Sequence, residues 1–209
     1  MRIIRVEHGG TSYYGILEDG LVFRLHQQPG HMEPIPLSEA KVLPLVTPSK
    51  VVCVGLNYKA HAEELGYPLP NMPSFFLKPP SSIIGNGEPI VLPSGMGRIE
   101  HEAELAMVVG KVCRNLTPEE AEESLFGFTC ANDVTAREVQ KVDPLIGHCK
   151  SYDTFCPIGP WIETELEDIN DLSIRCLVNG EVRQSANTGD MIFRPLDLLC
   201  FLSRVMTLM

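Results

Sequence analysis

The stretch IEHEAELAMVV, residues 99–109, decides the fold class of this chain. Polar and apolar residues alternate in it and then give way to branched apolar residues, a pattern typical of a β-strand. Side chains two residues apart on a strand point the same way, with Cα atoms roughly 6.6 Å apart. Glu102 and Glu104 are therefore expected on one face. That face continues into Ala106 and Val108, which indicates that it turns inward.

A third carboxylate, Asp133, follows in the stretch ANDVTAR, residues 131–137. Buried like charges are costly unless a cation neutralises them, and an all-oxygen ligand set suits Mg²⁺ or Mn²⁺ rather than zinc. The alternative is that Glu102 and Glu104 lie on the solvated face of an amphipathic strand, and that Asp133 caps a helix over 134–140. From these residues alone, both interpretations remain open.

The composition limits the classes of partner. The chain has 209 residues with 27 Asp and Glu against 17 Lys and Arg, a formal net charge of -10. This balance argues against nucleic acid or an anionic membrane as a partner. No run of about 18 apolar residues exists to span a membrane. The hydrophobic content of 44% is enough for one substantial core with a small appended domain.

The seven cysteines predict a reducing compartment. Their number is odd, their spacing is irregular, and no Cys-x-x-Cys motif occurs, which disfavours a zinc knuckle or a thioredoxin-like site. Cys53 and Cys200 stand in apolar contexts and read as buried free thiols. The N-terminus lacks the apolar stretch of a signal peptide. We therefore expect a soluble cytoplasmic protein.

Two regions are expected along the chain. Residues 1–47 form a small N-terminal β unit, because His8-Gly9-Gly10 and Asp19-Gly20 join short alternating runs in the manner of hairpin turns. Residues 26–41 look like a loop. Residues 48–209 form the second domain, and their many short strands with few helices predict a mixed, β-rich α+β fold.

Local signals place several elements of the second region. They predict a strand over 51–55, a helix over 57–65 ended by Gly66, a helix from the capping box Thr117-Pro118-Glu119-Glu120 to near Gly127, a short strand over 128–130, a hairpin turning at Asn179-Gly180, and an apolar helix opening at Arg194-Pro195. The proline-rich stretch 67–98 predicts extended loops and short strands. No internal repeat is visible.

Further catalytic candidates lie outside the three carboxylates. His61 and Glu64 are three residues apart on the predicted helix, so their side chains can meet, and a carboxylate raises the basicity of an imidazole. The alternative is a solvent-exposed helix pair. Lys150 near an oxygen-ligated metal would stabilise a developing oxyanion, although lysines, Lys78 included, are usually surface charges.

Six stretches together resemble the fumarylacetoacetate hydrolase family. They are CVGLNYKAH (53–61), FLKP (76–79), HEAEL (101–105), NDVTAR with Gln140 (132–140), Lys150-Ser151 before Gly159-Pro160, and Asn187-Thr188 followed by Met191. Each motif is weak alone, but six in the same order are specific. The resemblance covers about residues 50–209, and the small unit before it fits members that carry an N-terminal domain.

The resemblance implies a β-sandwich roll of coiled mixed sheets and a divalent metal, usually Mg²⁺ with Mn²⁺ or Ca²⁺ as substitutes, held by Glu102, Glu104 and Asp133. It implies His61 and Glu64 as a dyad on a mobile lid helix and Lys150 as an active-site lysine. The stretches that it covers also point to four substrate-binding residues: Lys78, Arg137, Gln140 and Thr188.

The implied substrates are β-dicarbonyl or 2-oxo acids of aromatic or amino-acid catabolism, chelated through keto and carboxylate oxygens. C–C bond hydrolysis of an acylpyruvate-like or fumarylacetoacetate-like substrate is our first expectation. Isomerisation of a 2-hydroxyhepta-2,4-diene-1,7-dioate and oxo-acid decarboxylation use the same enolate and remain alternatives.

One departure from the family pattern bears on activity. Members normally continue past the last predicted helix into a Gly-Asp turn and a Thr-Gly-Thr-Pro-type segment, whereas this sequence stops at Met209. A truncated, catalytically inactive member is therefore a further alternative. The family also implies a homodimer. The last helix is too apolar all round for a surface helix, so we expect it to pack into the core and to leave hydrophobic surface nearby.

Overall fold

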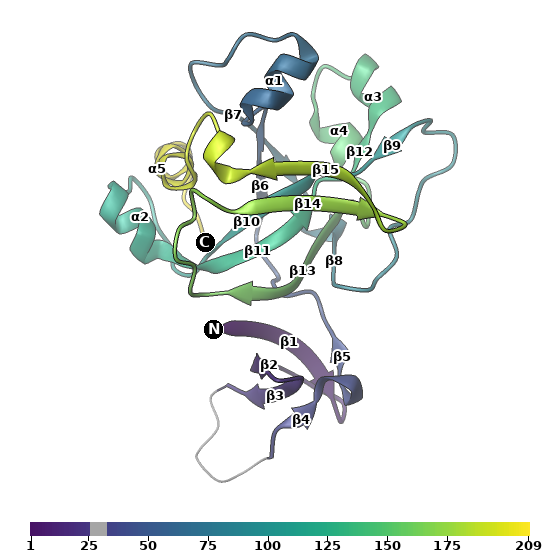
Figure 1. The fold of residues 1–209 in the computed structure, drawn as a ribbon, viewed down its shortest axis with the longest axis vertical. Helices are drawn as coiled ribbons and strands as arrows, with labels where there is room; N and C mark the ends of the chain where they lie inside the picture. Colours follow the sequence, from purple (N-terminus) through teal and green to yellow (C-terminus); the bar gives the residue numbers. More distant parts are fainter. Residues whose placement is uncertain (26–32) are drawn as a thin grey trace.

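A computed structural model describes residues 1–25 and 33–209, and β-structure dominates it (Figure 1). The strands are β1 Arg2–His8, β2 Thr11–Glu18, β3 Leu21–Arg24, β4 Ile35–Pro36, β5 Lys41–Val42, β6 Val51–Gly55, β7 Ser74–Lys78, β8 Ile83–Ile84, β9 Ile99–Glu100, β10 Ala103–Val109, β11 Leu125–Asn132, β12 Thr135–Ala136, β13 Cys156–Glu163, β14 Ser173–Val178 and β15 Glu181–Asn187. The α-helices are α1 Lys59–Leu65, α2 Pro118–Ser124, α3 Arg137–Val142, α4 Gly147–Lys150 and α5 Pro195–Val205. The mixed, strand-rich α+β class predicted above is confirmed.

One sheet of nine strands runs through both predicted regions. Its main path is β10-β11-β13-β1-β2-β3-β4, with β5 added to β1 and β8 added to β13. The N-terminal strand β1 pairs antiparallel with β13, where Arg2 lies opposite Glu163 and Ile3 opposite Ile162. The boundary near residue 47 stays a prediction, but the hydrogen-bonded sheet crosses it (Figure 1).

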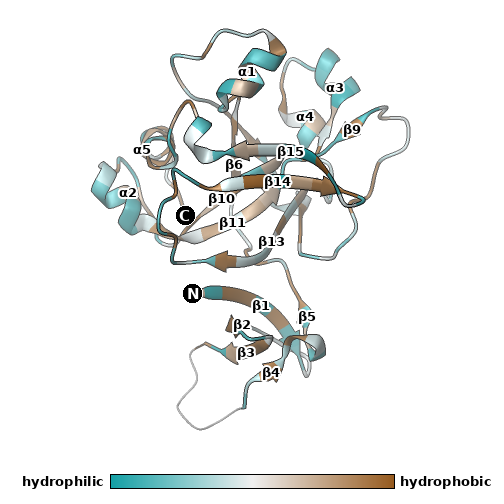
Figure 2. Cartoon of the chain, in the orientation of Figure 1, coloured by the Kyte–Doolittle hydropathy of each residue, from teal (hydrophilic) through white to brown (hydrophobic). Residues whose placement is uncertain are grey.

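The core has three clusters. The first packs β1 against β13 and includes Ile3, Val6 and Ile162. The second lies under α5, where Leu199 and Leu202 meet Ala121 of α2. The third surrounds Phe155 beside Val134 and supports the region where the candidate site lies. Figure 2 shows that β1 and β13 carry many hydrophobic residues, whereas the helices α2 and α3 are mostly hydrophilic.

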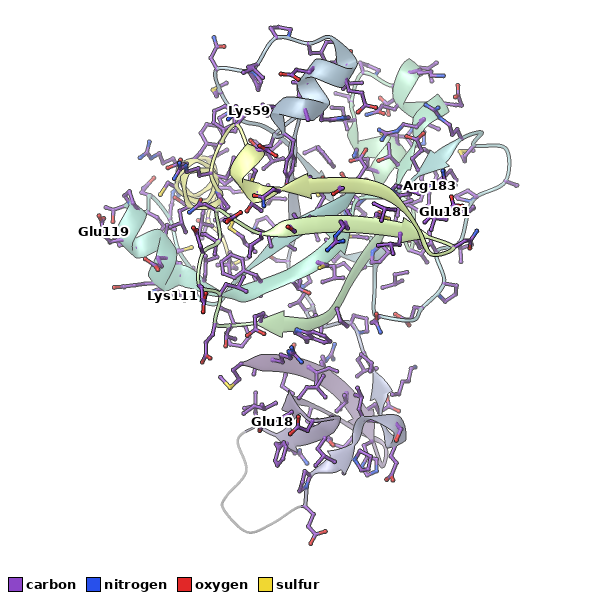
Figure 3. The ribbon with its side chains drawn as sticks, in the orientation of Figure 1. Glu18, Lys59, Lys111, Glu119, Glu181 and Arg183 are labelled. Atoms are coloured by element: carbon purple, nitrogen blue, oxygen red, sulfur yellow. The ribbon has the colours of Figure 1, made fainter. Side chains whose placement is uncertain are left out.

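The hairpin, capping and helix-end signals are confirmed. Gly66 adopts φ 67° after α1, and Asn179 and Gly180 turn the β14–β15 hairpin at φ 54° and 81°. Thr117 and Glu120 form both hydrogen bonds of the capping box at the start of α2. Figure 3 shows Glu181 and Arg183 on the same hairpin, where the side chains form an ion pair of 2.7 Å.

The predicted C-terminal helix forms as α5 and packs into the core. Leu198, Leu199 and Leu202 are buried, as expected for an apolar helix. Val205 differs, because it lies at the end of the helix with half of its surface exposed. Among the described residues, no helix is long and apolar enough to cross a membrane.

Four expectations are wrong in detail. The range 26–41, expected to be a loop, contains β4 and ends at Lys41, the first residue of β5, although residues 26–32 lie outside the described part. Helix α2 ends at Ser124, so β11 is longer than expected. No helix starts at Asp133, because β12 pairs with β9 there and α3 begins only at Arg137. All seven cysteines are free and Cys200 is buried, but Cys53, which was expected to be buried, is only partly so.

Candidate active site

The register of two strand pairs brings the acidic stretches together. Ala103 of β10 lies opposite Asn132 of β11, and Glu100 of β9 lies opposite Thr135 of β12. Between these pairs, the backbone N–H of Asp133 donates to the carbonyl oxygen of Glu102 over 2.8 Å. The predicted continuous strand over 99–109 is thus interrupted at 101–102. Glu102 stands just before β10, and its own N–H donates to the side-chain oxygen of Asn132 instead.

Two buried lysines neutralise these carboxylates. The Lys150 ammonium, at the end of α4, donates to Glu102 Oε2 over 2.8 Å and to Asp133 Oδ2 over 2.6 Å. The Lys78 ammonium, at the end of β7, pairs with Asp133 Oδ1 and also donates to the carbonyl oxygen of Val134. The two lysines are 4% and 1% exposed, so the interpretation of Lys78 as a surface charge is wrong. We call Glu102, Glu104, Asp133, Lys78 and Lys150 the acid–lysine cluster.

The electrostatics of Glu102 and Lys150 follow from their mutual contact. Burial alone would raise the pKa of Glu102, but Lys150 and Arg137 outweigh it and hold that pKa below its ordinary value. Burial likewise opposes the charged form of Lys150, yet Asp133 and Glu102 raise its pKa. Both groups are therefore charged at neutral pH. The ammonium also lies 5.0 Å from the centre of the Phe76 ring, a favourable cation–π position.

Glu104 has no such partner. Among the described residues, no hydrogen bond or ion pair reaches its carboxylate, whereas burial and then the charges of Glu102 and Asp133 raise its pKa to about 8. The Tyr58 hydroxyl is buried and finds no hydrogen-bond partner in the described part of the chain. Burial and then the charge of Glu104 raise the pKa of that phenol. Glu104 thus differs from Glu102 and Asp133: they are paired with lysines, whereas Glu104 has a raised pKa and no partner within the described chain.

Arg137 extends the cluster outward through ion pairs. Its Nη2 pairs with Glu102 Oε1 over 2.7 Å, and its Nε pairs with Glu100 Oε2 over 2.6 Å. Its Nη1 donates to the side-chain oxygen of Gln140 over 2.9 Å. In this arrangement Arg137 binds two carboxylates of the chain itself and Gln140 binds Arg137, so the substrate-binding role of both residues stays a prediction.

The predicted contact between His61 and Glu64 forms on α1. Nδ1 of His61 is 3.3 Å from Oε2 of Glu64 on α1, and both side chains are largely exposed. No hydrogen bond or ion pair among the described residues joins them to the cluster. Thr188 is buried, where its hydroxyl accepts a hydrogen bond from the N–H of Leu172. No such bond brings Thr188 to the cluster either, so these roles remain predictions.

Four residues around the site escaped the sequence analysis. Glu100 pairs with Arg137, and the Thr135 hydroxyl donates to Glu102 Oε1 over 3.1 Å. Phe76 covers Lys150, and the Gln184 amide bonds both the N–H and the carbonyl of Ala103 over 2.8 Å, which ties β15 to β10. Glu100 was visible in the acidic stretch, but the other contacts depend on pairing between distant segments.

The donor chemistry of the cluster fits a hard divalent ion, although the side chains are not gathered round one. Within the described part of the chain, no group of three or more His, Cys, Asp or Glu side chains stands ready to hold a metal ion. The Lys150 ammonium contacts both Glu102 and Asp133 and already neutralises them. The unpartnered Glu104 and the orphaned Tyr58 hydroxyl mark a polar site that a cation would complete.

Two known protein families match this chain. The family described as fumarylacetoacetate (FAA) hydrolase C-terminal matches residues 50–209, and the family described as Rv2993c-like, N-terminal matches residues 1–44. The chain therefore belongs to the fumarylacetoacetate hydrolase family, and its sheets follow that fold. The resemblance inferred from six short motifs is confirmed.

Named relatives differ in their reactions. The human protein named mitochondrial oxaloacetate tautomerase FAHD2A is 42% identical over 180 residues, which cover 83% of this chain and 57% of that protein. The solved structure of 5-carboxymethyl-2-hydroxymuconate delta-isomerase from Mycobacterium smegmatis matches with a TM-score of 0.90 at 38% identity, over 100% of this chain and 84% of that one. Maleylpyruvate hydrolase from Sphingobium sp. SYK-6, solved with manganese(II) and pyruvate, matches with a TM-score of 0.81 at 30% identity. The match covers 100% of this chain and 84% of that one.

Proposed function

We propose that this chain carries the site of a divalent-metal-dependent enzyme that interconverts the enol and keto forms of a 2-oxo acid. The observation that carries this proposal is the buried acid–lysine cluster, in which Glu102 and Asp133 share the Lys150 ammonium and their charges help to raise the pKa of the unpartnered Glu104. Such a set can bind a cation and an anionic substrate at once. Two relatives named as a tautomerase and an isomerase support this choice over the hydrolysis that we expected first.

Glu102, Glu104 and Asp133 are the residues that would hold the ion. We propose Mg²⁺, with Mn²⁺ and Ca²⁺ as alternatives, because carboxylate oxygens suit hard cations. When bound, the ion would supply Lewis-acid polarisation of a substrate keto oxygen. The Sphingobium relative, solved with manganese(II) and the 2-oxo acid pyruvate, supports both the class of ion and the class of substrate.

The chain's own residues would stabilise and move charge. An ammonium group such as that of Lys150 stabilises the negative charge that develops on an enolate oxygen. Lys78 holds Asp133 in place from the buried side, since its side chain is fully enclosed. Enol–keto exchange needs a group that removes and returns a proton at carbon. His61, whose Nδ1 faces Glu64, is the candidate for that role.

Hydrolysis of a C–C bond is the second candidate, and the His61–Glu64 pair favours it. A carboxylate beside an imidazole orients the ring, so that its free nitrogen can deprotonate a water molecule. The water would attack the distal carbonyl of an acylpyruvate-like substrate. Oxo-acid decarboxylation, also expected above, has no observation of its own that favours it.

A turnover comparison tests the proposal. The purified chain is treated with a chelator and then supplied with Mg²⁺ or Mn²⁺. Enol oxaloacetate is followed by its ultraviolet absorbance, with the spontaneous rate subtracted, and acylpyruvates are assayed for cleavage products. We expect metal-dependent ketonisation that Glu102→Gln abolishes. Cleavage without ketonisation would replace the first candidate by the second, and no metal-dependent turnover of either substrate would refute both.

Assembly and location are also proposals. A homodimer is expected because two-fold dimers are the commonest symmetric oligomers. Light scattering of the purified chain gives the mass directly, and a monomer at assay concentration would exclude the dimer. We retain the cytoplasm and aromatic or amino-acid catabolism as expectations from the free cysteines and from the substrate class.

A further inference from the structure

The two lysines of the acid–lysine cluster hold different kinds of contact. Lys78 belongs to β7, its side chain has no exposed surface, and it binds one carboxylate oxygen together with the backbone carbonyl of Val134. Lys150 ends the four-residue helix α4 and spans two carboxylates from different segments, Glu102 just before β10 and Asp133 just after β11. Lys78 therefore pairs with one carboxylate, that of Asp133, whereas Lys150 bridges the carboxylates of Glu102 and Asp133.

The position of Lys150 is the one that a shared cation would need. Its nitrogen lies within 2.8 Å of Glu102 Oε2 and of Asp133 Oδ2 at the same time. Oxygen atoms from both residues thus already converge on one positive charge. An ion bound there would be repelled by an ammonium in the same place, so the two cations exclude each other. Lys78, on the opposite oxygen of Asp133, leaves that place free.

We propose that Lys150 is an exchangeable internal cation, which neutralises Glu102 and Asp133 in the metal-free protein and is displaced when a divalent ion binds, whereas Lys78 stays on Asp133 throughout. The inference rests on the metal site of the proposed function. It also explains how Lys150 comes to serve the substrate, because its ammonium becomes available only after it leaves the two carboxylates. Binding of the metal ion and release of the Lys150 ammonium toward the substrate are then one event.

Nuclear magnetic resonance of the lysine ammonium groups observes the exchange in the unaltered chain. Buried, hydrogen-bonded ammonium groups of Lys78 and Lys150 are shielded from solvent exchange, and Lys150→Arg identifies the Lys150 signal by its loss. Diamagnetic Mg²⁺ is added to chelator-treated protein. We expect the Lys150 signal to shift or vanish on saturation and the Lys78 signal to persist. An unmoved Lys150 signal with bound Mg²⁺ would overturn the inference.

Calorimetric titration with Mn²⁺ provides an independent measurement. Lys150→Met removes the competing charge, so Mn²⁺ should bind at least about tenfold more tightly than to the unaltered chain. Lys150→Arg keeps a positive charge that can bridge the two carboxylates. This variant should therefore bind Mn²⁺ more weakly than Lys150→Met does. The control Arg98→Gln removes an exposed cation that pairs with Glu100 outside the cluster, and its effect should stay within about twofold.

The outcomes separate this inference from the proposed function. Unchanged or weaker Mn²⁺ binding by Lys150→Met, with normal binding by the unaltered chain, would overturn the exchange and leave the metal site in place. No binding of Mn²⁺ or Mg²⁺ by the unaltered chain would overturn both. If Lys150→Met does not fold, the resonance titration and Lys150→Arg still decide the question.

Discussion

Replacing Lys78 by methionine tests whether the cluster is held together by charge. The change keeps most of the side-chain volume but removes the ammonium that pairs with Asp133. The Lys78 side chain has no exposed surface and that of Asp133 is 10% exposed, so water cannot take over the lost contact. Removing one partner of a buried ion pair costs about 3–5 kcal/mol. Lys150 still binds the other oxygen of Asp133, which places the expected loss near the lower end, about 3 kcal/mol.

Thermal unfolding of the metal-free protein measures this loss. For a chain of this size, 1 kcal/mol shifts the midpoint by about 2–4 °C, so Lys78→Met should unfold about 6–12 °C lower. Lys59→Met is the matched control, because Lys59 is exposed at the start of α1 (Figure 3) and should stay within about 0.5 kcal/mol. Adding Asp133→Asn to Lys78→Met should recover part of the loss, since it neutralises a buried carboxylate that has lost one of its two ammonium partners. Equal midpoints for Lys78→Met and Lys59→Met would refute the reasoning.

Three further predictions concern other parts of the molecule. His61→Ala should lower turnover by about 10²–10⁴-fold with Mn²⁺ affinity nearly unchanged, and wild-type turnover would exclude His61 as the base. The raised pKa of Glu104, about 8 against an ordinary 4.5, means that the metal-free folded state keeps a proton that the unfolded chain loses. Stability should therefore fall as pH rises from about 4.5 to 8 and level off above, by a few kcal/mol, and Glu104→Gln should flatten this slope in denaturation curves. Thr117→Ala should cost about 1 kcal/mol through loss of the α2 cap, whereas Thr117→Ser should cost little in the same assay.

Features encoded over a few residues were predictable from the sequence. The Asn179-Gly180 turn, the Thr117 capping box and the helix end at Gly66 each depend on backbone preferences that neighbouring residues already determine. The family resemblance came from the same kind of short stretch. Local chemistry therefore gave the right elements, and most errors lay in where those elements begin and end.

Features that depend on distant pairing were not predictable. The alternation over 99–109 gives no sign that the strand breaks at 101–102, because the break follows from the bond between Glu102 and Asn132. The burial of Lys78 could not be read from FLKP, since its partner Asp133 lies 55 residues away. Lysine is usually exposed, so the general expectation failed where a carboxylate compensates the charge.

The pairing of β1 with β13 joins the strands of the N-terminal region to β11 and β10 in one sheet. The Met1 amino group contacts Glu163, 162 residues further along the chain, and Thr164 donates its N–H to the Met1 carbonyl. Local opening of β13 would leave Arg2 and Ile3 without their partners on that side, although β1 stays paired with β2, and fraying of the first strand would expose an edge of β13. Amide hydrogens of β1 that face β13 should then exchange with the opening of β13, whereas those that face β2 should not. A reporter placed at Arg2 or Ile3 would thus follow the integrity of the sheet that runs on through β11 to β10, the strand carrying Glu104.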